Sequence, residues 1–318
     1  MKPSLFPAKV LLFGEYGIIE NSSGLSIPHS FYQGTLKFHS NLSFKKEFLH
    51  SNSQLEKYYK FLFFLEQKKK NLAKIDLKNL YEDIQKGISF HSNIPQGYGI
   101  GSSGALVAAI YEKYAKNKLC LKKRNINIIT LKKIFSQMES FFHGKSSGID
   151  PLICYLNLPL LIRSETDIYS IGIPDKNNFQ EKKGKGRGAI FLIDSGFPRK
   201  TYSMIEFFFV KLKHDSFKKI LKEEFMKYNE KCIEAFLKGD FNNLLKNVKL
   251  LSTWVFHHFR PMIPKNFWKI WEEGLLTNLH YLKLCGSGGG GFILGFTPNY
   301  EISREKLKEY ATEVLFRF

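Results

Sequence analysis

Apolar and polar positions alternate with two different periods along this chain, and each period predicts a different element. Near the N-terminus, "AKVLLFGEYGII" (residues 8–19) predicts a strand, a Gly-Glu turn and a second strand. Alternation over residues 34–48 predicts more strand, whereas the apolar spacing of "LEKYYKFLFF" (residues 55–64) has the period of a helix. Further helices are expected over residues 103–116 and 131–142.

The second half of the chain mixes short strands with helices. Strands are expected at residues 159–163, 168–173, 189–194 and 292–296. Several helices are expected up to Trp271, and a last helix closes the chain. The polar stretch "QEKKGKGRG" (residues 180–188) is typical of a linker or a surface hairpin.

Chain length and element order together predict two α+β domains. With 318 residues, of which 43% are hydrophobic, the chain can bury a large core. Strands and helices interleave without a regular βαβ repeat, which disfavours a doubly wound sheet. We expect one domain over residues 1–187 and the other over residues 188–318.

Charge leaves two interpretations open. A formal net charge of +19 favours an anionic partner, such as nucleic acid, a membrane surface or a small anion. The lysine pairs and triplets are scattered, however, and Lys, Asn, Ile and Phe are all abundant, as a coding bias would produce. No basic stripe interleaved with aromatic residues is present. We therefore expect a solvated basic surface and no nucleic acid, and a homodimer stays open.

Cysteine usage and hydropathy predict a cytoplasmic protein. The four cysteines show no paired spacing and no histidine partners at metal-site distances, which is typical of buried thiols in a reducing compartment. No apolar run reaches the length of a membrane span, so no membrane partner is expected. The short apolar stretch Val10–Phe13 leads directly into Gly14-Glu15, which predicts a strand and not a signal peptide.

A glycine-rich segment, "PQGYGIGSSGA" (residues 95–105), comes directly before a predicted helix. Glycines leave backbone N–H groups open, and a helix N-terminus adds unpaired donors and partial positive charge, which is what a phosphate group needs. A serine at this point can cap the helix or offer its hydroxyl to Mg²⁺. A plain loop with a serine cap is the alternative.

A second segment, "ESFFHGKSSGIDP" (residues 139–151), presents two carboxylates near a predicted helix end. Glu139 and Asp150 suit a divided role, in which one binds a metal ion and the other orients a hydroxyl or accepts its proton. The alternatives are a surface position for Glu139, a helix-dipole partner for His143 and a turn residue for Asp150.

Lys9 in "PAKVLLFGEY" lies among apolar residues of a predicted strand. A buried ammonium group needs a partner. The alternative is an edge-strand lysine that reaches water.

The segments "PAKVLLFGEY", "PQGYGIGSSGA" and "LCGSGGGGF" (residues 284–292) resemble, in this order, the three signature motifs of the GHMP kinase superfamily. Within it, "HGKSSGID" is similar to the His-Gly-x-Pro-Ser-Gly-x-Asp pattern of mevalonate kinases, and "PRKT" is similar to their Arg-x-Thr stretch. The resemblance implies the two-domain GHMP fold, with an N-terminal domain like domain 2 of ribosomal protein S5 and a ferredoxin-like C-terminal domain. It implies phosphorylation of mevalonate with ATP and Mg²⁺.

The resemblance also implies roles for individual residues. Asp150 would be the catalytic carboxylate and Lys9 its partner, and Ser103 and Glu139 would bind the metal ion. The nucleotide would be bound by Pro95, Gly97, Gly99, Gly101, Ser102, Ser103, Gly104 and Ala105. Substrate contacts are implied for Lys9, Glu15, Tyr16, His143, Gly148, Asp150, Arg199 and Thr201. Structural glycines are implied at Gly286, Gly288, Gly289 and Gly290, where a turn would pack against the nucleotide loop.

Four positions depart from the mevalonate kinase pattern. Ala8 stands where glycine is common, Tyr16 where histidine is usual, Ser146 where proline is usual and Pro151 where asparagine is usual. A tyrosine at the position of Tyr16 is associated with phosphomevalonate kinases. Phosphomevalonate kinase or another GHMP kinase is therefore an alternative, and an inactive relic that only binds nucleotides or nucleic acid is a non-enzymatic one.

Overall fold

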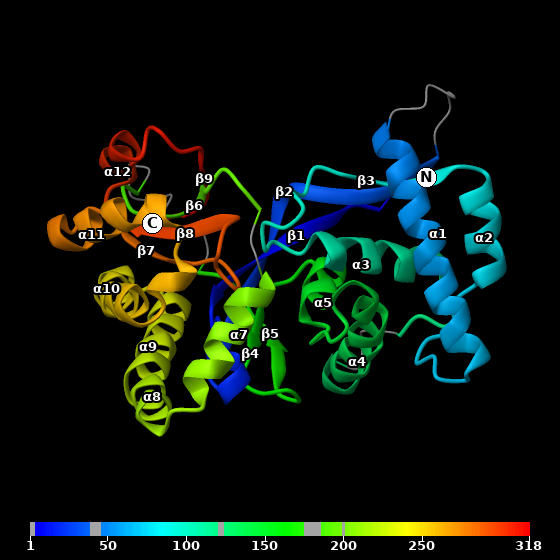
Figure 1. The fold of residues 1–318 in the computed structure, drawn as a ribbon, viewed down its shortest axis with the longest axis horizontal. Coiled ribbons are helices and arrows are strands. Elements are labelled where there is room, and N and C mark those ends of the chain that lie inside the picture. Colours follow the sequence, from blue (N-terminus) through cyan, green and yellow to red (C-terminus); the bar gives the residue numbers. More distant parts are fainter. Residues whose placement is uncertain (1–3, 39–45, 120–123, 175–185, 199–200) are drawn as a thin grey trace. The chain divides into compact units, whose positions relative to one another are not determined.

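The computed structural model describes residues 4–38, 46–119, 124–174, 186–198 and 201–318 (Figure 1). Its internal contacts divide the chain into two compact units, each assembled from separate segments. Unit 1 comprises residues 1–9, 28–95 and 101–158, and unit 2 comprises residues 10–27, 96–100 and 159–318. Strands β1 (Phe6–Phe13) and β2 (Gly24–Phe38) each run from one unit into the other.

Unit 1 is mainly helical. Its strand β3 (Ile88–Ser92) pairs antiparallel with the end of β2, with Gly34 opposite Ser92 and Phe38 opposite Ile88. Its helices are α1 (Lys46–Gln67), α2 (Leu77–Gln85), α3 (Ser102–Tyr114), α4 (Arg124–His143) and α5 (Ile149–Leu156). Helices α3, α4 and α5 lie side by side (Figure 1), and every residue of α3 from Gly104 to Tyr111 is buried. The centre of unit 1 is therefore α3.

Unit 2 contains a four-stranded antiparallel sheet in the order β7 (Tyr281–Leu284), β8 (Phe292–Thr297), β6 (Ala189–Asp194) and β9 (Thr312–Arg317). The two central strands are almost completely buried, which explains their continuous apolar sequences. Two short strands extend the sheet beside the first residues of β2. Strand β4 (Leu160–Ile162) pairs antiparallel with β2, and β5 (Ile168–Ser170) pairs antiparallel with β4.

Along the chain, most helices of unit 2 lie between β6 and β7, and the last one lies between β8 and β9. They are α7 (Thr201–Leu212), α8 (Asp215–Ile220), α9 (Met226–Leu237), α10 (Phe241–His258), α11 (Trp268–Thr277) and α12 (Tyr300–Lys306). Between α8 and α9 the backbone forms a π-helical turn, Leu221–Phe225. Helices α9 and α10 pack against each other, and α10 also packs on β7.

Several predicted elements differ from the structure. The second strand expected near residue 19 is a 3-10 turn, Gly17–Glu20, because Tyr16 and Asn21 on either side have left-handed backbones with φ of 59° and 66°. Residues 46–48 begin α1 instead of extending a strand, and the remaining residues of that prediction after Phe38 lie outside the described ranges. The chain closes with strand β9, which follows the expected last helix.

The predicted linker is described only in part, since residues 180–185 lie outside the described ranges. Gly188 at its end exchanges two backbone hydrogen bonds with Phe318, of 2.9 Å and 3.0 Å. This end of the stretch is therefore tied to the C-terminal residue.

Two further expectations concern the cysteines and the membrane. Cys154, Cys232 and Cys285 are buried thiols that form no disulfide, as predicted, whereas Cys120 lies outside the described residues. Across the described part of the chain, every helix is too short or too polar to cross a bilayer.

Candidate active site

Lys9 and Asp150 form an ion pair in unit 1. Lys9 lies in β1 between the fully buried residues Ala8 and Val10, and only 6% of its own surface is exposed. Its Nζ atom lies 3.0 Å from Oδ1 of Asp150, whose side chain is 33% exposed. Asp150 is in the first turn of α5, where the helix dipole favours a negative charge. Lys9 therefore meets a carboxylate partner and does not extend to water.

Two glycines allow the helices around Asp150 to approach closely. A Cβ atom at Gly104 of α3 would lie 2.8 Å from the backbone of both Asp150 and Pro151. A Cβ atom at Gly148, which has φ of 72°, would lie 2.1 Å from the carbonyl oxygen of Lys132 in α4. Asp150 is therefore placed by backbone contacts that larger residues would not allow.

Glu139 lies in α4, four residues before its end at His143, and is only 3% exposed, so it is not a surface residue. Its Oε1 atom accepts a hydrogen bond of 2.9 Å from the Ser103 hydroxyl, and its Oε2 atom accepts one of 2.5 Å from the Ser146 hydroxyl. Burial, followed by the negative charge of Asp150, raises the pKa of Glu139 to about 7, while the two hydroxyls and Lys9 act in the opposite direction.

The Ser103 hydroxyl joins α3 to α4. It lies 3.1 Å from Nε2 of His143, an exposed residue at the end of α4, as well as bonding Glu139. Gly101 occupies the N-cap position of α3 with φ of 83°, and within the described residues no side chain caps this helix. Ser103 is therefore directed at Glu139, and the alternative of a serine cap does not apply to this residue.

The glycines of the predicted phosphate loop all have left-handed backbones. The φ angles of Gly97, Gly99 and Gly101 are 78°, 82° and 83°, which L-residues rarely adopt. Between them, the Tyr98 ring packs on Phe292 with centroids 5.1 Å apart. Pro95 precedes this loop, and Ser102, Gly104 and Ala105 follow it as the first turns of α3.

The glycine cluster near the C-terminus is a turn between β7 and β8 and not a linker. Its glycines all have positive φ, including Gly286, Gly288, Gly289 and Gly290. A Cβ atom at Gly291 would lie 2.8 Å from Tyr98 Cα of the phosphate loop, and one at Gly288 would lie 2.8 Å from the Met262 carbonyl oxygen. The bare backbone thus allows two close approaches within unit 2.

Glu15 and Tyr16 contact the strand and the turn of this glycine cluster. The carboxylate of Glu15 is buried against Nζ of Lys283 in β7, and Lys283 also donates to the carbonyl oxygen of Leu284 at 3.1 Å. The Tyr16 hydroxyl donates to the carbonyl oxygen of Ser287 at 2.6 Å. Among the other predicted substrate residues, Thr201 is the first residue of α7, and Arg199 lies outside the described residues.

Two residues of these networks were missed in the sequence. Lys283 could have been found by the pattern that indicated Lys9, because it too is a lysine among apolar residues of a strand. Ser146 was noted only as a departure from a pattern that has proline at this position. Its contact with Glu139 depends on the conformation of the loop between α4 and α5, which composition does not reveal.

The oxygen atoms of Ser103 and Glu139 fit Mg²⁺. No group of three or more His, Cys, Asp or Glu side chains that could hold a metal ion occurs among the described residues. Mg²⁺ does not need such a group, because it takes one or two protein oxygens and completes its octahedron with phosphate oxygens and water. The hydroxyl of Ser103 at the start of α3 and the carboxylate of Glu139 in α4 therefore suit an ion that arrives with a nucleotide.

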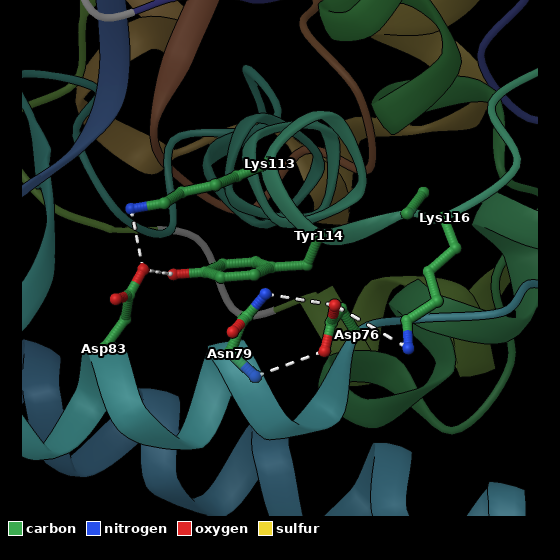
Figure 2. Close-up of a pocket in the computed structure, with 7 residues that line it drawn as sticks. Asp76, Asn79, Asp83, Lys113, Tyr114 and Lys116 are labelled. Carbon is green, nitrogen blue, oxygen red and sulfur yellow. Dashed lines mark hydrogen bonds and ion pairs between the residues drawn. The ribbon is translucent and has the colours of Figure 1, made fainter.

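A separate cavity of about 360 Å³ lies at the other end of α3. Asp83 contacts Lys113 and Tyr114 at 2.9 Å each. Asp76 interacts with Asn79 and Lys116 (Figure 2). These carboxylates are thus neutralised by neighbouring side chains. None of the predicted site residues lines this cavity, so it is not the candidate active site.

Comparison with known proteins identifies the fold. Residues 67–157, which include α3, α4 and α5, match the family model of the GHMP kinases N terminal domain. No curated protein matches the sequence. The matched segment contains Ser103, Glu139 and Asp150.

Similar solved structures span nearly the whole chain. A mevalonate kinase from Methanococcus jannaschii is 19% identical, with a TM-score of 0.59 over 98% of this chain and 96% of that one. A Streptococcus pneumoniae phosphomevalonate kinase, in complex with phosphomevalonate and AMPPNP, is 14% identical, with a TM-score of 0.59 over 100% and 99%. A Lactococcus lactis galactokinase complexed with galactose is 13% identical, with a TM-score of 0.61 over 98% and 92%. The chain therefore has the α+β fold of GHMP kinases.

Proposed function

We propose that this protein transfers the γ-phosphoryl group of ATP to the hydroxyl group of mevalonate. One observation carries the proposal: residues far apart in the sequence contact each other. Lys9 forms an ion pair with Asp150, and Ser103 donates a hydrogen bond to Glu139. Phosphoryl transfer depends mainly on positioning and on neutralising charge. A buried cation, a partly exposed carboxylate and a hydroxyl–carboxylate pair supply these requirements.

Asp150 and Lys9 act on the acceptor. The partly exposed Asp150 carboxylate orients the substrate hydroxyl and accepts its proton, while the oxygen forms a bond to the γ-phosphorus and the bond from this phosphorus to the ADP oxygen breaks. The fixed positive charge of Lys9 stabilises the negative charge that develops on the attacking oxygen. Lys9 also holds Asp150 in one orientation through the 3.0 Å contact.

Ser103 and Glu139 would hold Mg²⁺, which when bound neutralises the charge of the phosphates. The loop of Gly97, Gly99 and Gly101 offers backbone N–H groups to these phosphates, and the start of α3 adds its dipole. His143 lies beside Ser103 and is proposed to contact the substrate together with Gly148. Substrate contacts of Glu15, Tyr16, Arg199 and Thr201 remain predictions.

Mevalonate is favoured by the His143–Asp150 segment, which is similar to that of mevalonate kinases, and by the Methanococcus jannaschii structure. Phosphorylation of phosphomevalonate is the second candidate, because Tyr16 replaces histidine in the first motif and the Streptococcus pneumoniae enzyme is similar over the whole chain. Because both of these proteins share the fold, the acceptor has to be decided by experiment.

A coupled assay of ADP release tests the proposal with four acceptors: mevalonate, phosphomevalonate, galactose and homoserine. We expect Mg²⁺-dependent turnover that is fastest with mevalonate. Fast turnover with phosphomevalonate and none with mevalonate would select the second candidate. Binding of ATP without turnover of any acceptor would contradict the kinase proposal and favour an inactive relic of the fold.

A further inference from the structure

Ser146 lies in the loop between α4 and α5, at a position where the pattern of the similar mevalonate kinases has proline. We infer that Ser146 is a positioning residue that holds the Glu139 carboxylate in the orientation needed to bind Mg²⁺. This inference rests on the proposed function, and it gives a role to a hydroxyl that the proposed chemistry does not use.

The hydrogen bonds around Ser146 have a defined direction. The backbone N–H of Gly148 donates to Ser146 Oγ at 3.0 Å. The hydroxyl proton of Ser146 is then directed at Oε2 of Glu139. The two hydrogen bonds form a chain, from the Gly148 N–H through the Ser146 hydroxyl to the Glu139 carboxylate. Bonds in such a chain polarise one another, so the carboxylate is held more firmly than it would be by a hydroxyl that accepts no hydrogen bond.

The loop itself is attached to the helix that carries Glu139. Ser136 of α4 donates its hydroxyl to the carbonyl oxygen of Ser146 at 2.6 Å. Gly148 packs so closely on α4 that a Cβ atom would lie 2.1 Å from the Lys132 carbonyl oxygen. Ser146 is therefore fixed relative to Glu139 before any ligand arrives, and Glu139 pays little entropy to stay in place.

The two oxygens of Glu139 have different neighbours. Oε1 faces Ser103, the other proposed metal ligand, and Oε2 faces Ser146. With Mg²⁺ bound, Ser103 and Glu139 would each offer an oxygen to the ion in place of the bond between them. The bond from Ser146 would remain and would orient the carboxylate. Outer contacts of this kind are worth about 10- to 100-fold in metal affinity.

The test measures binding of Mn²⁺, as a spectroscopic substitute for Mg²⁺, to the full chain in the presence of ADP. Electron paramagnetic resonance detects the free ion, so the readout does not depend on turnover. We expect Ser146→Ala to weaken Mn²⁺ binding by about tenfold and to raise the Mg²⁺ concentration for half-maximal turnover more than it lowers maximal turnover. Ser146→Thr keeps a hydroxyl and should bind Mn²⁺ like the wild type.

Ser147→Ala is the matched control, since this neighbouring hydroxyl accepts a 3.3 Å bond from the N–H of Ile149 within the same loop. It should bind Mn²⁺ like the wild type. Equal Mn²⁺ affinity of the wild type and Ser146→Ala would overturn the inference. So would a loss of Mn²⁺ affinity in Ser147→Ala or in Ser146→Thr that is as large as the loss in Ser146→Ala. Should Ser146→Ala fail to fold, Ser146→Cys, with its weaker hydrogen bond, takes its place.

The same experiment separates this inference from the proposed function. Wild-type protein that binds Mn²⁺ with ADP but phosphorylates no acceptor would contradict the proposed function, while the Ser146 variants would still decide the inference. Wild-type protein that does not bind Mn²⁺ with ADP would contradict both.

Discussion

Asp150 and Glu139 are both carboxylates of the candidate site, but they have different surroundings. Asp150 is open enough to meet a substrate and has the Lys9 ammonium group beside it. Glu139 is buried, and two serine hydroxyls point at its two oxygens. The same functional group is thereby suited to two tasks, which are contact with the acceptor for Asp150 and binding of the metal ion for Glu139.

Asp150→Asn should lower turnover by at least about a hundredfold and leave ATP affinity nearly unchanged, because the lost carboxylate acts on the acceptor hydroxyl. Steady-state kinetics and a nucleotide-binding titration measure the two effects. Lys9→Met should lower turnover in the same way. Near wild-type turnover of the Asp150 variant would remove this residue from the proposed mechanism.

Glu139→Gln should stabilise the metal-free protein at high pH. The folded-state pKa of about 7 lies above the usual value of 4.5, so between these values the folded state binds more protons than the unfolded state. The free energy of unfolding therefore falls as pH rises from about 4.5 to about 7 and is level above that range. Removing the charge should raise the free energy of unfolding by on the order of 3 kcal/mol at pH values above this window and by almost nothing below it.

Denaturant unfolding of both proteins with a chelator present, at one pH above the window and one below it, measures this difference. The same substitution should abolish Mg²⁺-dependent turnover. A stability difference that is independent of pH would show that Glu139 is not the group that titrates.

At the scale of elements, the approach of α3 to α5 determines where Asp150 lies. Gly104 lies inside α3, and the backbone at the start of α5 occupies the space of its missing side chain. Helix propensity alone predicts that alanine at this position would stabilise the protein by about 1 kcal/mol. The contact of 2.8 Å predicts the opposite sign, because one helix would have to move.

Gly104→Ala should therefore destabilise the protein by roughly 1–3 kcal/mol and reduce turnover by displacing Asp150. Thermal unfolding and ADP release measure both effects. Gly172→Ala is the control, since nothing lies within 4 Å of its added Cβ atom and its backbone is not left-handed. A stabilised and fully active Gly104 variant would show that the two helices can separate without cost.

Local periodicity predicted the long helices better than the short ones, whereas apolar runs also indicated short strands such as β4 and β5. The helix expected over residues 103–116 is α3, and that expected over residues 131–142 lies within α4. By contrast, α2, α5 and β3 were not predicted, and each has only nine residues or fewer. Such short segments show less than three turns of a helix or a few positions of a strand, so their structure depends on the neighbours that they pack against.

At the scale of the whole molecule, the net charge of +19 should attract anionic substrates. Raising the ionic strength shortens the Debye length to about 8 Å at physiological salt, which screens the long-range part of this attraction. The KM values of ATP and of the anionic acceptor should therefore rise with salt, while maximal turnover changes little. An ionic-strength series measures this, and KM values that are flat across the series would leave the charge as an effect of composition.

The division of the molecule into domains follows contacts and not chain order. Each compact unit contains separate segments, and the strands β1 and β2 pass between them. The single boundary between residues 187 and 188 stays a prediction. It is placed there because "QEKKGKGRG" is the one shift of composition in the sequence that suggests a linker.

The sequence by itself determined the features that depend on neighbours along the chain. These are the long helices, the buried strands and the left-handed glycines, together with the choice of Lys9, Ser103, Glu139 and Asp150 as candidates. Periodicity and backbone conformation are local properties, and the motifs combine residue types that phosphate and metal chemistry require.

Only the tertiary structure decided which of these side chains meet. It buried Glu139, turned Ser103 away from capping α3, brought Ser146 to the second oxygen of Glu139 and paired Lys283 with Glu15. It also added β9 to the sheet beside β6. The physical reason is that burial, ion pairing and strand pairing are set by residues distant in sequence, whose positions no local pattern encodes.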